Sequence, residues 1–159
     1  MSEAGGDKAT TAPAEAEASI LFVCTLNAVR SPIAATIARS ALGSDVRIDS
    51  VGVYEGYADP FAAAVMAEAG YDLSSHEPKQ FDDVKQDDFS VVVALTEEAL
   101  RAVEERYKGR QVSVEYWPIP NPSDVHGGRE QIMDSYRTAR EELRRRIHER
   151  FRKAPPASK

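Results

Sequence analysis

Short apolar runs alternate along this chain with segments in which apolar residues recur at helical spacing. The runs at residues 20–23, 46–50, 89–95 and 112–117 each have the length of a strand, and together they predict four strands. The run at 89–95 is continuous and rich in β-branched residues, which is typical of a central strand that is buried on both faces. The run at 46–50 is more polar.

Four helices are predicted between and after these runs. The first begins at Ser31-Pro32, with Ser31 as its N-cap, and ends at Gly43. The second spans residues 60–68, and the third follows a cap at Thr96. The last helix carries an apolar face formed by Ile132, Tyr136, Leu143, Ile147 and Phe151.

Strands that alternate with helices predict an α/β fold. We expect a single domain at residues 19–153, built on a four-stranded open parallel sheet with helices on both faces. The topology is doubly wound and flavodoxin-like, with strand order 2-1-3-4. Residues 1–18, rich in Ala, Glu, Gly and Thr, predict a disordered tail, and residues 154–159 predict a flexible one.

The segment from Cys24 to Ser31 follows the first strand, at the edge of the sheet where such folds carry their sites. A tight loop that leads into a helix N-terminus turns its amide hydrogens toward a bound anion. The positive field of these amides and of the helix N-terminus also lowers the pKa of a thiol at the base of the loop. The planar guanidinium of Arg30 adds several N–H donors that can bind two oxygens of a tetrahedral anion. We therefore predict phosphoryl transfer through a phosphocysteine on Cys24. The alternative is a buried apolar Cys24 and a surface Arg30.

We expect the phosphate to be bound by the loop residues that follow the nucleophile, which are Thr25, Leu26, Asn27, Ala28, Val29 and Arg30. Twenty basic against 26 acidic side chains give a net charge of −6, which argues against nucleic acid as a partner. One cysteine excludes an intrachain disulfide and a cysteine-rich zinc site, and it suits a reducing cytoplasm. No apolar run approaches the ~20 residues that span a bilayer, and no secretory signal precedes the first strand. We expect a cytoplasmic protein, monomeric or weakly dimeric, that needs no membrane, cofactor or metal.

The residues Val23-Cys24, Asn27 and Arg30-Ser31-Pro32 resemble the motif of the low-molecular-weight protein tyrosine phosphatases. The resemblance extends from Ser19 to about Phe151, and the motif is shared with thiol arsenate reductases of the same fold. It implies hydrolysis of phosphotyrosine in proteins or of a small aryl phosphate. Inorganic phosphate or a similar oxyanion would be a competitive ligand.

Two further segments resemble the family, namely residues 48–52, which end its second strand, and residues 73–76, which hold its histidine. The resemblance implies a hydrogen-bond network that holds the loop in shape, in which Ser31 also donates to the Cys24 sulfur and stabilises it as a leaving group. Its members would be Asn27, Ser31, Ser50 and His76.

Five positions around the loop refine this resemblance. Tyr54 and Tyr57 follow the second strand, where the family places an aromatic wall of the substrate cleft. We assign Tyr54 to substrate binding. The alternative for either residue is an exposed tyrosine in a turn. Leu26 stands where the family commonly has glycine, which narrows the backbone conformations of the loop. Val29 replaces the second cysteine of some members, and Thr96 replaces an aspartate of many.

The family's general acid is an aspartate followed by proline, and here that site aligns with Asn121-Pro122. An asparagine cannot give a proton, and the loss of a positioned acid costs ~10²–10⁴ in rate. Asp124 lies three residues further on and could act as a substitute acid; a capping or turn aspartate is the alternative. The sequence therefore predicts a phosphatase attenuated at Asn121.

Two other functions remain open. A thiol arsenate reductase of this fold generally uses further cysteines, which this chain does not have, so an external thiol would have to complete the cycle. A phosphate- or phosphopeptide-binding module would keep the loop and lack turnover, and Asn121 is the residue that motivates this hypothesis.

Overall fold

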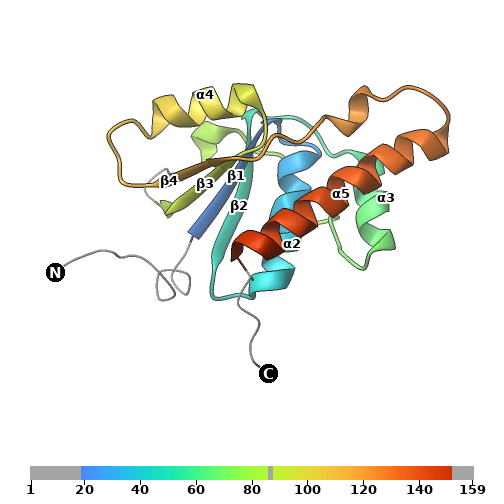
Figure 1. Cartoon of the computed structure of the whole chain (residues 1–159), viewed down its shortest axis with the longest axis horizontal. Coiled ribbons are helices and arrows are strands. Elements are labelled where there is room, and N and C mark those ends of the chain that lie inside the picture. Colours follow the sequence, from blue (N-terminus) through green and yellow to red (C-terminus); the bar gives the residue numbers. More distant parts are fainter. Residues whose placement is uncertain (1–18, 86–87, 152–159) are drawn as a thin grey trace.

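The structure is a computed structural model and describes residues 19–85 and 88–151. In this part of the chain a parallel sheet is covered by helices on both faces, as the sequence predicts (Figure 1). The tails predicted at residues 1–18 and 154–159 lie outside the described residues.

Four parallel strands form the sheet. β1 (Ser19–Leu26) pairs with β2 (Arg47–Tyr54) on one side and with β3 (Val91–Ala94) on the other. β4 (Ser113–Tyr116) pairs with β3, so the order is β2-β1-β3-β4 and the predicted order 2-1-3-4 is confirmed. The apolar side chains of β3 are all buried, because β3 lies inside the sheet between two helical layers.

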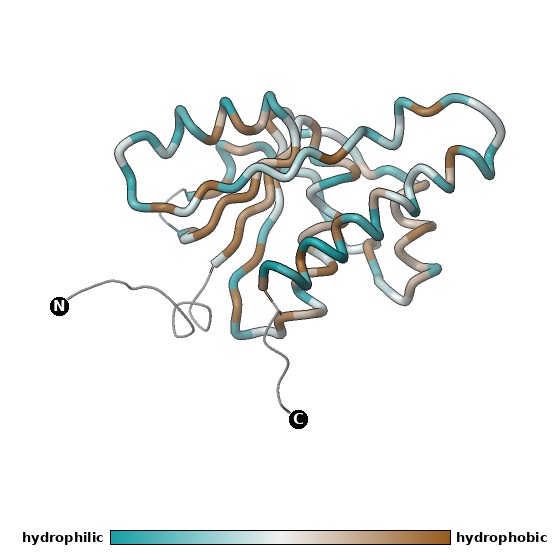
Figure 2. The backbone as a smooth tube through the Cα atoms, viewed as in Figure 1, coloured by the Kyte–Doolittle hydropathy of each residue, from teal (hydrophilic) through white to brown (hydrophobic). Residues whose placement is uncertain are grey.

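Three helices cover one face of the sheet (Figure 1). They are α2 (Arg30–Leu42), α3 (Pro60–Glu68) and α5 (Arg129–Phe151). Their buried residues form one core with the residues of β1 and β3 that point to this face, such as Phe22 and Val93. A helix that packs on a sheet buries one stripe of side chains, which explains the alternating hydropathy along α5 in Figure 2.

The other face is covered by α4 (Glu97–Arg106) and the short 3-10 helix η1 (Phe81–Asp83) (Figure 1). The predicted cap is present, since the Thr96 hydroxyl accepts a hydrogen bond from the Ala99 amide at 2.9 Å. No helix in the described ranges is both long enough and apolar enough to cross a membrane.

Several boundaries differ from those predicted by one to four residues, and three of them lie beside the segment at residues 24–31, which we call the Cys24 loop. β1 continues to Leu26, three residues beyond the predicted end, so Cys24 lies within the strand and does not follow it. α2 begins at Arg30, its N-cap position is Val29, and Ser31 lies inside the first turn with its hydroxyl on the Cys24 sulfur. The prediction of Ser31 as N-cap is therefore wrong, because its hydroxyl is taken up by the sulfur. β2 continues to Tyr54, four residues beyond the predicted end, because β1 is long enough to pair with it there.

A buried carboxylate joins α3 to α5. Asp59 caps α3, with its Oδ1 accepting from the amides of Phe61 at 2.8 Å and Ala62 at 3.3 Å. The Tyr136 hydroxyl of α5 donates to Oδ2 of the same carboxylate at 2.8 Å. Both Asp59 and Tyr136 are buried, so the Tyr136 hydroxyl depends on Oδ2 of Asp59 for its acceptor.

We expect Asp59→Ala to lower the free energy of unfolding by about 2–4 kcal/mol, because it removes a helix cap and leaves a buried hydroxyl without its acceptor. Tyr136→Phe should cost about 1 kcal/mol, since the cap remains. Urea unfolding of both single variants and the double variant measures the coupling between the two groups. A double variant whose loss equals the sum of the single losses would contradict the proposed joint role of the pair.

Candidate active site

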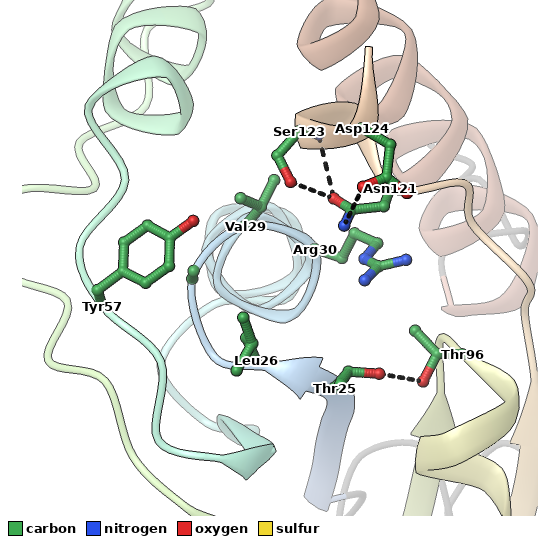
Figure 3. A pocket seen from close by; sticks show the side chains of 10 residues that line it. Thr25, Leu26, Val29, Arg30, Tyr57, Thr96, Asn121, Ser123 and Asp124 are labelled. Carbon is green, nitrogen blue, oxygen red and sulfur yellow. Dashed lines mark hydrogen bonds between the residues drawn. The ribbon is translucent and has the colours of Figure 1, made fainter.

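A pocket of about 370 Å³ opens where the Cys24 loop meets the ends of β2, β3 and β4. Figure 3 shows that its walls come from four segments: the loop itself, Tyr57 after β2, Thr96 after β3, and the proline-rich loop after β4. Ten residues line it, namely Thr25, Leu26, Ala28, Val29, Arg30, Tyr57, Thr96, Asn121, Ser123 and Asp124.

Most of the predicted site residues meet at this pocket. Of the loop residues expected to bind phosphate, all but Asn27 line it, and Asn27 is buried beneath. Tyr57 lines the pocket, whereas Tyr54 does not, so the assignment of Tyr54 to the substrate wall is not supported. The Tyr54 hydroxyl instead donates to Glu98 of α4 at 3.0 Å.

The Cys24 sulfur is completely buried, and a carbonyl group faces it. The thiol donates to the Leu26 carbonyl oxygen at 2.8 Å, and the same oxygen accepts from the Ala28 amide at 2.7 Å. In a trans peptide the N–H points opposite to the C=O, so the Asn27 amide hydrogen points away from the sulfur. The predicted ring of inward amides is therefore interrupted at the Leu26–Asn27 peptide.

Burial raises the pKa of the Cys24 thiol above its ordinary value. Hydrogen bonds from Ser31 and the positive charge of Arg30 act in the opposite direction but do not outweigh burial. In this conformation the net effect on the thiol pKa is thus opposite to the lowering that the sequence predicts for Cys24. The reason is that the loop closes over the sulfur and removes the solvent that would stabilise a charged form.

Buried hydrogen bonds centred on Asn27 fix the loop from below. Its Nδ2 donates to the hydroxyls of Ser31 at 2.9 Å and Ser50 at 3.2 Å, and its Oδ1 accepts from the Lys79 amide at 2.8 Å. The Ser31 hydroxyl accepts from the Asn27 side chain, and its hydrogen has two acceptors within reach, the Cys24 sulfur at 2.8 Å and the Val51 carbonyl oxygen at 3.3 Å. The predicted partners are therefore in contact around the loop.

His76 approaches the same loop from its outer side. Its Nε2 lies 3.4 Å from the Asn27 carbonyl oxygen, and the ring is half-buried. Burial lowers the pKa of His76, an effect that the bond to Asn27 opposes and the charges of Lys79 and Arg39 increase. The ring is consequently neutral at neutral pH and can donate one hydrogen bond to the loop.

Two glycines allow β2 and the turn after it to pack closely on the loop. A Cβ atom added at Gly52 would lie 2.5 Å from the Asn27 backbone nitrogen, and one at Gly56 would lie 2.7 Å from it. Gly56 also has a positive φ of 82°, which side chains rarely adopt. The close approach therefore requires glycine at both positions.

Arg30 connects the loop to the proline-rich segment. One of its guanidinium nitrogens donates to the Ile119 carbonyl oxygen at 2.9 Å, which leaves further donors for a bound anion. Burial lowers the pKa of Arg30, and the nearby Cys24 and Asp124 oppose this shift. An arginine remains cationic at neutral pH, so the pocket has one fixed positive charge on its wall.

Sequence reasoning missed several contacts of the loop, among them the Lys79 amide on Asn27 and the Ile119 carbonyl on Arg30. Both partners are main-chain groups, so side-chain identity contains no signal for them. Within residues 19–85 and 88–151, the side chains of His, Cys, Asp and Glu form no group of three or more that could hold a metal ion.

We expect the Cys24 thiol of the anion-free protein to titrate at or above the range of an ordinary cysteine. Ser31→Ala should raise its pKa further, because it removes a hydrogen bond that favours the thiolate. The ultraviolet absorbance of the thiolate, followed against pH with Cys24→Ser as the blank, measures both values. Titration of the wild-type thiol well below neutral pH would contradict the closed conformation of the loop.

Known proteins share both the sequence and the fold. The family model for low molecular weight phosphotyrosine protein phosphatase matches residues 19–154. A glutaredoxin arsenate reductase of Synechocystis sp. is 26% identical over 128 residues, which cover 80% of this chain and 92% of that protein. A low molecular weight protein-tyrosine-phosphatase of Streptomyces coelicolor is 40% identical over 93 residues, which cover 53% and 56%. The tyrosine phosphatase Wzb of Escherichia coli K30, in complex with sulphate, shares the fold with a TM-score of 0.73 at 21% identity, over 86% and 98% of the two chains.

Proposed function

Since the chain belongs to the low molecular weight phosphotyrosine protein phosphatase family, we propose that it hydrolyses phosphomonoesters through a phosphocysteine on Cys24. The observation that carries this proposal is the position of the nucleophile. Cys24 and Ser31 are buried and do not line the pocket, but the Cys24 sulfur lies 2.8 Å from the Ser31 hydroxyl, and the residues next to them in sequence, Thr25 and Arg30, line it. A nucleophile, a hydrogen bond to stabilise it and a cation for the anion are thus grouped at one site.

The reaction has two steps. The Cys24 thiolate attacks phosphorus in line, the S–P bond forms, and the P–O bond to the leaving group breaks with its electron pair on oxygen. Water then attacks the phosphocysteine, and inorganic phosphate and the thiolate are released. Arg30 binds two non-bridging oxygens in both steps, and the Ser31 hydroxyl stabilises the sulfur when it departs.

The loop has to change before it can bind the substrate. A phosphate dianion and the Leu26 carbonyl oxygen repel each other, so both cannot lie against the Cys24 sulfur. Rotation of the Leu26–Asn27 peptide would replace the carbonyl with an amide donor. The sulfur would then lose the acceptor of its proton and gain a donor, and both changes favour the thiolate.

The mouth of the pocket suits an aryl phosphate. The ring of Tyr57 and the side chain of Leu26 line it and are both substantially exposed, at 50% and 41%. A phenyl ring that enters between them would bury apolar surface and stack on the tyrosine. Phosphotyrosine in a protein and small aryl phosphates are therefore the substrates we propose.

A second candidate is arsenate reduction, which the arsenate reductases among the relatives favour. The chain has one cysteine, so glutathione or another external thiol would have to reduce the oxidised Cys24. A third candidate is a phosphate-binding module without turnover, which the asparagine at position 121 motivates.

We expect p-nitrophenyl phosphate and a phosphotyrosine peptide to be hydrolysed in the presence of a metal chelator, and Cys24→Ser to abolish turnover while it retains phosphate binding. Acid quenching during turnover should trap phosphate on Cys24, which mass spectrometry detects. Phosphate binding without turnover of either ester would support the binding module instead. Arsenate reduction with glutathione, in the absence of ester hydrolysis, would support the second candidate.

Leu26→Gly should strengthen inhibition by inorganic phosphate by about fivefold, on the order of 1 kcal/mol, because glycine relieves the backbone restriction at the peptide that must rotate. Leu26→Ala is the matched control, since it removes the side chain and keeps the restriction. Inhibition constants from steady-state kinetics measure the effect. Equal changes in both variants would mean that the leucine side chain, and not the backbone, limits phosphate binding.

A further inference from the structure

The turn after β4 places three polar side chains at the pocket, Asn121, Ser123 and Asp124 (Figure 3). Asn121 occupies the position that aligns with the family's proton donor. We propose that Asp124 gives the leaving group its proton and that Asn121 is a positioning residue for it. This inference rests on the proposed phosphatase function and moves the acid three residues along the chain.

Asn121 is engaged in the turn itself. Its Oδ1 accepts from the Ser123 amide at 3.1 Å and from the Ser123 hydroxyl at 2.8 Å, so both lone pairs of this oxygen are in use. Its Nδ2 donates to Oδ1 of Asp124 at 3.4 Å. The side chain therefore caps the short 3-10 helix η3 (Pro122–Asp124) and orients the carboxylate at its end.

η3 is anchored to the rest of the protein. Pro122 is buried, and its carbonyl oxygen accepts from the Ser135 hydroxyl of α5 at 3.0 Å. The Asp124 amide also donates to the Asn121 carbonyl oxygen at 3.1 Å. Asp124 is thus held at the pocket by a turn with defined hydrogen bonds, as a positioned acid requires.

Asp124 has the chemistry that the site otherwise lacks. Among the described residues that line the pocket, it is the one carboxylate. When the P–O bond breaks, its electron pair goes to the phenolic oxygen, which takes the proton of the Asp124 carboxyl. The resulting carboxylate then accepts a proton from the water that attacks the phosphocysteine, and the carboxyl is restored.

A competing role for Asp124 is that of counterion. Arg30 lies close enough for the two charges to interact, and position 96, where many family members carry an aspartate, is threonine. A counterion would act on Arg30 and hence on phosphate binding. Substitution of a counterion would change the hydrolysis rates of all substrates by the same factor, whatever their leaving group.

The leaving group distinguishes these roles. We expect Asp124→Asn to lower kcat for phenyl phosphate by ~10²–10⁴, because a phenolate with a pKa of about 10 departs slowly without a proton. For 2,4-dinitrophenyl phosphate, whose leaving group is far more acidic than phenol and departs readily without a proton, the loss should be below about tenfold. The fall of kcat with rising pH should also disappear in the variant, and the inhibition constant of phosphate should stay within about twofold. Equal losses for both esters, or weaker phosphate binding, would overturn the proposal.

Variants of Asn121 test its positioning role. Asn121→Ala should lower kcat for phenyl phosphate by about tenfold and leave phosphate inhibition unchanged, because it removes the cap that orients Asp124. In the Asp124→Asn background, Asn121→Asp should restore a large part of the lost activity, since it creates an acid at the adjacent position. A large gain from Asn121→Asp alone, with no loss in Asp124→Asn, would assign the acid position to residue 121 and overturn the proposal.

The same assays separate this inference from the proposed function. If the wild-type protein hydrolyses neither phenyl phosphate nor 2,4-dinitrophenyl phosphate, the phosphatase function fails and the inference fails with it. If it hydrolyses both esters and Asp124→Asn shows no dependence on the leaving group, only the role of Asp124 fails.

Discussion

The buried side-chain amide of Asn27 is the interaction on which the site depends. Its hydrogen bonds reach Ser31 at the start of α2, Ser50 on β2 and the main chain of Lys79. These partners come from three separate segments, so one amide fixes the shape of the loop against the fold. A buried amide that lost any of them would carry an unsatisfied group, which makes the arrangement costly to change.

Above this fixed base, the Leu26–Asn27 peptide determines the chemical state of the nucleophile. With its carbonyl oxygen 2.8 Å from the sulfur, it stabilises a protonated and buried Cys24. The same peptide in the opposite orientation would offer an amide hydrogen to an anion. In our proposal, rotation of this one peptide converts the closed thiol site into an oxyanion site.

The second half of the site is built on the other side of β1. The chain after β4 continues along β3, with the Trp117 amide on Ala94 at 2.8 Å and the Ile119 amide on Leu95 at 3.2 Å. This brings the Ile119 carbonyl to Arg30 and η3 to the mouth of the pocket. The position of η3 relative to Cys24 is therefore set by the pairing of β1, β3 and the chain after β4.

The sequence by itself determined the elements, the strand order and the identity of the loop around Cys24 and Arg30, because periodicity, caps and a short motif are local properties. The resemblance to the family also predicted that Asn27, Ser50 and His76 support the loop. Only the tertiary structure decided the direction of the Leu26 carbonyl, the burial of Cys24 and the choice of Tyr57 over Tyr54 at the pocket. Each of these features depends on atoms from several segments that are distant in the sequence and pack together in the fold. The orientation of a peptide and the pKa of a buried group result from all of these contacts, so a local sequence pattern does not predict them.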